Sequence, residues 1–121
     1  MMPRMSIDVE PQRDLVRITL AGFFAPADVA RFVAERDAAH QRLRCGPNQH
    51  LTLVDIRAMR IQSQDSVAAF QQVLGDPRMV SRRLAFVVAR SLARLQIRRA
   101  AAEREAAYFT AIEDAEAWLL A

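Results

Sequence analysis

The residues best suited to chemistry gather in one short stretch after an apolar run that ends in aspartate. They are Asp55, Arg57, Arg60, Ser63, Asp65 and Ser66. Carboxylate and guanidinium groups at the carboxyl end of a strand can bind anions or a charged partner, and loops at that end form the crevice of open α/β sheets. We therefore expect the working surface of the protein at this strand-to-helix junction.

Arginines could build an anion site at the junction. Arg57 and Arg60 follow the apolar run, and Arg90 follows the next one along the chain. If the loops converge, their guanidinium groups can bind a carboxylate, a phosphate or an acidic partner helix. If they do not converge, the three are solvated loop charges. Both interpretations stay open.

Ser63, Asp65 and Ser66 lie where a helical pattern begins. Asp65 is either a fixed charge that stands in for a phosphate or an ordinary first-turn acid, which the helix dipole stabilises by a few tenths of a kcal/mol up to about 1. A phosphoryl group on Ser63 or Ser66 would be stabilised at the same terminus, whereas capping is the commoner role of such serines.

No pattern predicts catalysis, a metal or a cofactor. His40, Cys45 and His50 have a superficially ligand-like spacing, but no Cys-x-x-Cys or His-x-x-x-His pair accompanies them. There is no Gly-x-Ser-x-Gly elbow, spacing ties neither histidine to a nucleophile, and the three glycines form no phosphate loop. We expect a non-catalytic protein without bound metal or cofactor.

Phe23 and Phe24 lie in the loop before the first expected helix. Two adjacent rings cannot easily both be buried, so one is expected to face the core. An exposed ring would form a sticky surface or the lip of an apolar pocket, and the alternative is partial shielding by the helix.

The elements that must position these residues follow from periodicity and length. Alternation predicts strands over 6–10 and 15–21, and apolar runs predict strands over 51–56, 84–89 and 106–109. A helical period predicts helices from Pro26 to about Arg44, from 63 to 74, from 91 to 103 and from 112 to 120. The inward stripe of the first helix comprises Val29, Phe32, Val33, Arg36, Ala39 or His40, and Leu43.

Strands separated by helices indicate crossover connections. The order strand-strand-helix-strand-helix-strand-helix-strand-helix predicts an α/β fold with a mixed, mainly parallel sheet and an N-terminal antiparallel edge hairpin. The 121 residues suit one domain, 1–121.

Composition narrows the class of protein. Hydrophobic residues make up 52%, which is typical of a globular protein, and all 17 basic residues are arginine against 14 acidic residues. A GC-rich genome tends to encode such an Arg-only, Ala-rich chain. Arg90, Arg94 and Arg98 share a helix face without interleaved aromatics, so we expect no nucleic-acid binding. With one cysteine, no bilayer-length apolar run and no signal peptide, we expect a cytoplasmic protein without membrane insertion.

The order of elements resembles that of STAS domains, the anti-sigma-factor antagonist fold, and more closely their SpoIIAA-like relatives. The opening strand pair, the strand end Leu53-Val54-Asp55 and the closing segment from Phe109 to Leu119 carry the resemblance over nearly the whole chain. Regulatory members carry Asp-Ser-Ser-Gly at the start of the second helix, where a partner kinase phosphorylates a serine. The matching positions here are Ser63-Gln64-Asp65-Ser66, so the motif is absent.

Two functions follow as hypotheses. The resemblance implies a bacterial regulatory or protein-interaction module that binds a protein partner through the junction and is not switched by the usual phosphorylation. The alternative is a carrier of a small apolar or lipid-like ligand, held by apolar helix faces with Phe23 or Phe24. A homodimer is compatible with either function.

Overall fold

A computed structural model of the protein describes residues 3–60, 62–76, 80–89 and 106–121. Its strands are β1 Arg4–Glu10, β2 Leu15–Ala21, β3 Leu51–Asp55, β4 Arg83–Val87 and β5 Ala107–Phe109. Its helices are α1 Pro26–His40, α2 Gln64–Leu74 and α4 Ile112–Leu120, and a short 3₁₀ turn η1 spans Pro11–Arg13. The helix expected over 91–103 lies outside the described residues, as does Arg90.

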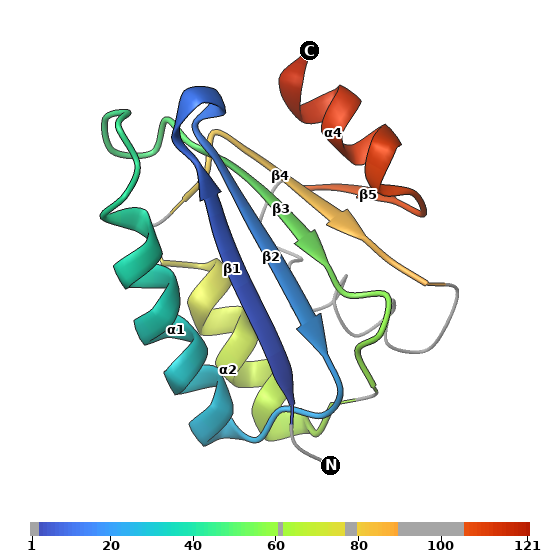
Figure 1. Cartoon of the computed structure of the whole chain (residues 1–121). Helices are drawn as coiled ribbons and strands as arrows, with labels where there is room; N and C mark the ends of the chain where they lie inside the picture. Colours follow the sequence, from blue (N-terminus) through green and yellow to red (C-terminus); the bar gives the residue numbers. More distant parts are fainter. Residues whose placement is uncertain (1–2, 61, 77–79, 90–105) are drawn as a thin grey trace.

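The strands form one sheet in the order β1-β2-β3-β4-β5 (Figure 1). β1 and β2 are antiparallel, and the pairs β2–β3, β3–β4 and β4–β5 are parallel. The mixed α/β sheet with an antiparallel edge hairpin is therefore confirmed. The order does not reverse among the described strands, so the sheet lacks the topological switch point that creates a crevice at the strand ends of doubly wound folds.

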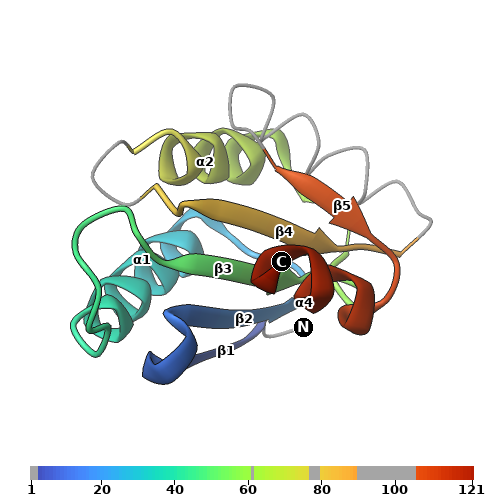
Figure 2. The same ribbon diagram turned by 90° about the horizontal axis from the view of Figure 1, so that it is seen from above.

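Successive side chains along the strands point to opposite faces of the sheet and form two separate hydrophobic cores. One face of the sheet packs against α1 and α2, and the opposite face packs against α4 (Figures 1 and 2). The α4 side is the smaller cluster: Leu15, Leu51, Leu53, Ala85, Val87, Ala115 and Leu119. β3 and β4 are buried on both faces, which explains why they appear in the sequence as apolar runs.

Local capping explains where the helices start. The Asp28 carboxylate accepts a hydrogen bond from Ala25 N at 2.9 Å, and Ser63 Oγ accepts one from Ser66 N at 3.2 Å. The end of α1 was predicted a turn too late. The helix ends at His40, because the chain tightens into i→i−3 hydrogen bonds such as Leu43 N to His40 O at 3.1 Å.

α4 is tied to the sheet at its carboxyl end by Arg83. Arg83 Nη1 donates to Trp118 O at 2.7 Å, and its guanidinium lies 5.4 Å from the centroid of the Trp118 ring. Trp118 stays 37% exposed at the rim and contacts Phe109. None of the described helices has the length and apolar character needed to cross a membrane.

Candidate functional site

The junction after β3 holds a closed ion pair. Arg57 Nη2 and Nε donate to the two oxygens of Asp55 at 2.8 and 3.0 Å, and Arg57 N donates to the same carboxylate at 3.1 Å. Burial alone would raise the pKa of Asp55, but the hydrogen bonds from Arg57 and its charge outweigh burial and hold that pKa below its ordinary value. Arg57 is thus already paired with the carboxylate beside it.

The remaining junction residues have different environments. Arg60 is exposed in the loop before α2, and Ser63 and Asp65 are exposed at the start of the helix. Ser66 is fully buried, and its hydroxyl donates to Phe24 O. Ser63 therefore caps the helix, as expected, whereas Ser66 joins α2 to the loop before α1 and is not presented at the surface in this conformation.

A buried glutamine, Gln62, joins the β3–α2 loop to the β2–α1 loop. Gln62 Oε1 accepts from Phe24 N at 2.7 Å, and Gln62 Nε2 donates to Gly22 O at 3.0 Å and to Arg60 O. Two backbone hydrogen bonds reinforce the connection: Arg60 N donates to Gly22 O at 2.9 Å, and Gly22 N donates to Ala58 O at 3.0 Å. No pattern in the sequence indicates this role of Gln62, because Phe24 N and Gly22 O belong to residues 38 and 40 positions earlier in the chain.

The two phenylalanines face in different directions. Phe24 is fully buried and packs edge-on against Phe70, with ring centroids 5.8 Å apart. Phe23 is 41% exposed. Neither phenylalanine belongs to the described residues that line the cavity between the sheet and helices α1 and α2.

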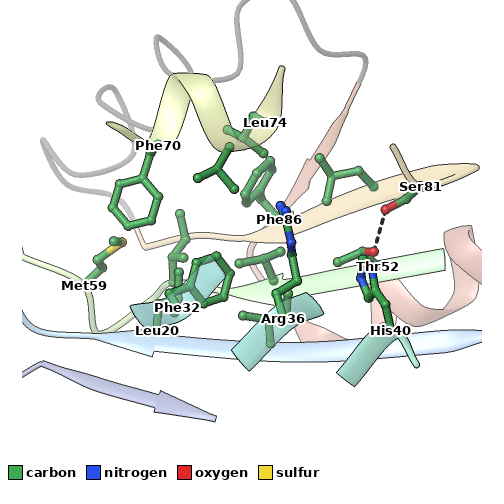
Figure 3. Close-up of a pocket in the computed structure, with 15 residues that line it drawn as sticks. Leu20, Phe32, Arg36, His40, Thr52, Met59, Phe70, Leu74, Ser81 and Phe86 are labelled. Carbon is green, nitrogen blue, oxygen red and sulfur yellow. Dashed lines mark hydrogen bonds between the residues drawn. The ribbon is translucent and has the colours of Figure 1, made fainter. Parts of the chain in front are cut away.

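That cavity lies between the sheet and helices α1 and α2 (Figure 3) and has a volume of about 70 Å³. Its apolar wall includes side chains from both helices and from β2, β3 and β4, namely Ile18, Leu20, Phe32, Val54, Phe70 and Phe86 among others. Arg36, His40, Thr52 and Ser81 supply a polar side. Figure 3 shows Arg36 between the labelled aromatic residues Phe32 and Phe70 and the polar group His40, Thr52 and Ser81.

Arg36 is the buried charge of this cavity. It is 7% exposed, and its hydrogen bonds to described residues run from Nε and Nη2 to Asp37 Oδ1 at 3.4 and 3.3 Å. The Asp37 side chain is 45% exposed. Burying an arginine beside apolar rings is costly unless its charge is compensated. The position of Arg36 on the inward stripe of α1 is therefore visible in the sequence and indicates a polar site inside the fold.

The other polar groups form a connected chain. Thr52 Oγ1 and Ser81 Oγ are 2.5 Å apart, and Ser81 Oγ is 3.3 Å from His50 Nε2. The His40 and His50 rings are tilted against each other with centroids 4.6 Å apart. Spacing in the sequence ties neither histidine to a hydroxyl group, but the structure brings His50 to Ser81, because strand pairing joins the starts of β3 and β4. Burial, followed by the charge of Arg36, lowers the pKa of His40 despite the opposing charge of Asp37.

A second hollow lies outside the cavity, between α1 and α2. It has a volume of about 350 Å³ and is lined by Pro26, Val29, Ala30, Val33, Arg36, Ala69, Gln72, Val73 and Asp76. Arg36 and Val73 line both the cavity and this outer groove. The arginine therefore lies at the boundary between the interior and the surface.

Metal ligands do not gather within the part of the chain that the structure describes. No three His, Cys, Asp or Glu side chains there are placed to hold a metal ion. Cys45 is a free, half-buried thiol, and burial together with Asp14 raises its pKa.

The sheet order, the two helices over one face and α4 on the other define a SpoIIAA-like α/β fold. A crystal structure of an uncharacterised protein of the DUF3478 family from Shewanella loihica PV-4, described as having a SpoIIAA-like fold, is similar over 97% of this chain and 93% of that chain. The TM-score is 0.72 and the sequence identity 18%, a level that shows the fold alone. No protein-family model and no curated protein matches the chain. The fold expected from the order of elements is confirmed.

Proposed function

We propose that this protein is a non-catalytic domain that binds a small, mainly apolar ligand between its sheet and helices α1 and α2. The observation that carries the proposal is the cavity of about 70 Å³ with a mainly apolar wall between the sheet and helices α1 and α2. A single water needs roughly 10–15 Å³ of such space, so the cavity has room for more than one water or for a short organic group.

An empty cavity of this size would cost stability. At the cost of about 24 cal/mol per Å³ for an enclosed apolar cavity, roughly 1.7 kcal/mol is the upper limit for the 70 Å³ of this partly open one. A ligand that restores contacts with Phe32, Phe70 and Phe86 would offset that cost, and its binding would raise the stability of the folded state.

A titration with a neutral probe tests this function. We expect butan-1-ol to cause saturable changes in methyl NMR shifts of cavity residues such as Ile18, Leu20 and Val54. Val73→Phe should abolish the changes, because Val73 lines the cavity and the larger ring fills it. Val33→Phe is the matched control, because Val33 is also a half-buried helical valine but lines only the outer groove. Absence of saturable changes in the wild-type protein would refute the proposal.

A second function, that of a protein-interaction module, is supported by the hydrogen bonds of Gln62 to the β2–α1 and β3–α2 loops, which we call the Gln62 brace. The brace holds the β2–α1 and β3–α2 loops together, so that exposed Phe23, Arg60 and Asp65 project from one fixed end of the molecule. A preordered surface loses little conformational entropy on binding, and exposed aromatic and arginine residues are common anchors of interfaces.

Cross-linked pull-downs from the native host test this second function. The Arg60→Glu, Asp65→Ala double variant should lose a specific partner, whereas Arg31→Glu, Glu35→Ala on the exposed side of α1 should keep it. A partner that both variants retain would show that the junction is not its binding surface.

A further inference from the structure

We infer that the ligand carries an anionic group, specifically a carboxylate on a short apolar chain, and that Arg36 binds this group at the polar side of the cavity. The inference rests on the proposed ligand-binding function and names the chemical class of the ligand. Its starting point is Arg36, a charged residue that is only 7% exposed and that lines the cavity together with aromatic and aliphatic side chains.

The charge of Arg36 is compensated only weakly by its neighbour. A guanidinium offers five N–H donors. Those used toward described residues reach a single oxygen of Asp37 at 3.3 and 3.4 Å, which is longer than the usual charge-assisted hydrogen bond of about 2.7–2.9 Å. The guanidinium therefore retains donor capacity for a second carboxylate.

The position of the nearby acids indicates the side on which that carboxylate binds. Asp37 is 45% exposed, and Asp76 lines the outer groove. Among the described residues that line the cavity, none is acidic. An anion in the groove would be repelled by these carboxylates, whereas an anion on the cavity side of Arg36 meets a cation in surroundings of low polarity, where the attraction is stronger.

Polar side chains around the same space can complete the carboxylate site. Thr52, Ser81 and His40 line the cavity on the side where Figure 3 places them beside Arg36. Hydroxyl and imidazole N–H groups can donate to the carboxylate oxygens. The apolar chain of the ligand would then extend toward Phe32 and Phe70, where the wall is aromatic.

The volume limits the length of that chain. A single water needs roughly 10–15 Å³ of such space, so a cavity of about 70 Å³ suits a chain of only a few carbon atoms. Butyrate is therefore the probe, with butan-1-ol as its neutral counterpart of equal chain length.

The experiment compares both probes by NMR titration or calorimetry in four proteins. In the wild type, butyrate should bind more tightly than butan-1-ol. Arg36→Met should weaken butyrate binding by about tenfold or more, since a hydrogen bond to a charged group contributes about 1.5–3 kcal/mol, and should leave butan-1-ol binding nearly unchanged. Asp37→Asn should strengthen butyrate binding severalfold, because it removes the competing carboxylate. Arg31→Met, at an exposed position of α1, should change neither affinity.

A further readout distinguishes recognition of charge from simple filling of the cavity. A carboxylate bound beside His40 favours the imidazolium, so butyrate should raise the pKa of His40, measured by its ring NMR signals, whereas butan-1-ol should not. Arg36→Lys keeps the charge and should retain part of the preference for butyrate.

The outcomes separate the two proposals. If both probes bind with equal affinity and Arg36→Met changes neither, the anion inference is overturned and the ligand-binding function stands. If neither probe binds to the wild type, the ligand-binding function itself fails. Should Arg36→Met not fold, as judged by circular dichroism, an unchanged butyrate affinity in Asp37→Asn would overturn the inference.

Discussion

Replacing Gln62 by alanine should loosen the junction between the β2–α1 and β3–α2 loops. The side chain makes three hydrogen bonds to backbone groups of Phe24, Gly22 and Arg60, and it is almost fully buried. A net contribution of about 1 kcal/mol per hydrogen bond predicts a loss of about 3 kcal/mol in the free energy of unfolding. The cost is high because the buried Phe24 N–H is left without its acceptor.

Thermal unfolding followed by circular dichroism measures this loss. With an unfolding entropy of about 2.1 cal/mol/K per residue, the 121 residues give about 0.25 kcal/mol/K, so Gln62→Ala should lower Tm by about 12 °C. Gln64→Ala, at an exposed position of α2, is the control and should change Tm by no more than a degree or two. A Tm decrease in Gln62→Ala as small as that of the control would show that the two loops do not depend on this brace.

Three further predictions concern titratable and phosphorylatable groups. Ser66→Asp should lower the free energy of unfolding in urea by about 3 kcal/mol or more, because the side chain is fully buried. Ser63→Asp should change it by no more than about 0.5 kcal/mol, because aspartate also caps helices, and equal effects of the two variants would contradict the assigned burial. His40 has a lowered pKa in the folded state, so the unfolded state binds the proton more readily and the free energy of unfolding should fall as the pH drops below about 6.5. His40→Gln should flatten this part of the plot of unfolding free energy against pH, and an unchanged slope would contradict the prediction. Arg57 lowers the pKa of Asp55, so their half-exposed pair should add less than about 1 kcal/mol to the free energy of unfolding above pH 3.8, and this contribution should be lost as the pH falls through the lower pKa of the folded state. Arg57→Gln should remove this loss, as measured by acid titration of the free energy of unfolding.

The fold could be predicted because its determinants are local. Strands buried on both faces appear as unbroken apolar runs, and helix starts carry their own marks, such as Asp28 and Ser63. The end of α1 was harder to place, since the tightening after His40 leaves no residue of distinctive type. The contact between Trp118 and Arg83 could not be predicted either, because the arginine comes from a strand 35 residues earlier in the chain.

The candidate site was less predictable than the fold. Proximity along the chain suggested the junction around Asp55, where the structure places a closed ion pair with Arg57. The cavity depends on pairing across β2, β3 and β4 and on two helices packed over them, and spacing in the sequence does not reveal such an assembly. Arg36 was the available signal, because a charge on the inward stripe of an amphipathic helix demands a compensating partner.

The sequential strand order has a consequence for the synthesis of the chain on the ribosome. Every described strand from β2 onward pairs with the strand made just before it, so each of these strands has a partner as soon as it emerges. The face that contains Leu15, Leu51 and Leu53 stays open, however, until the last helix, α4, emerges and covers it. A nascent chain released before residue 112 would expose this apolar surface and be a target for chaperones or proteases.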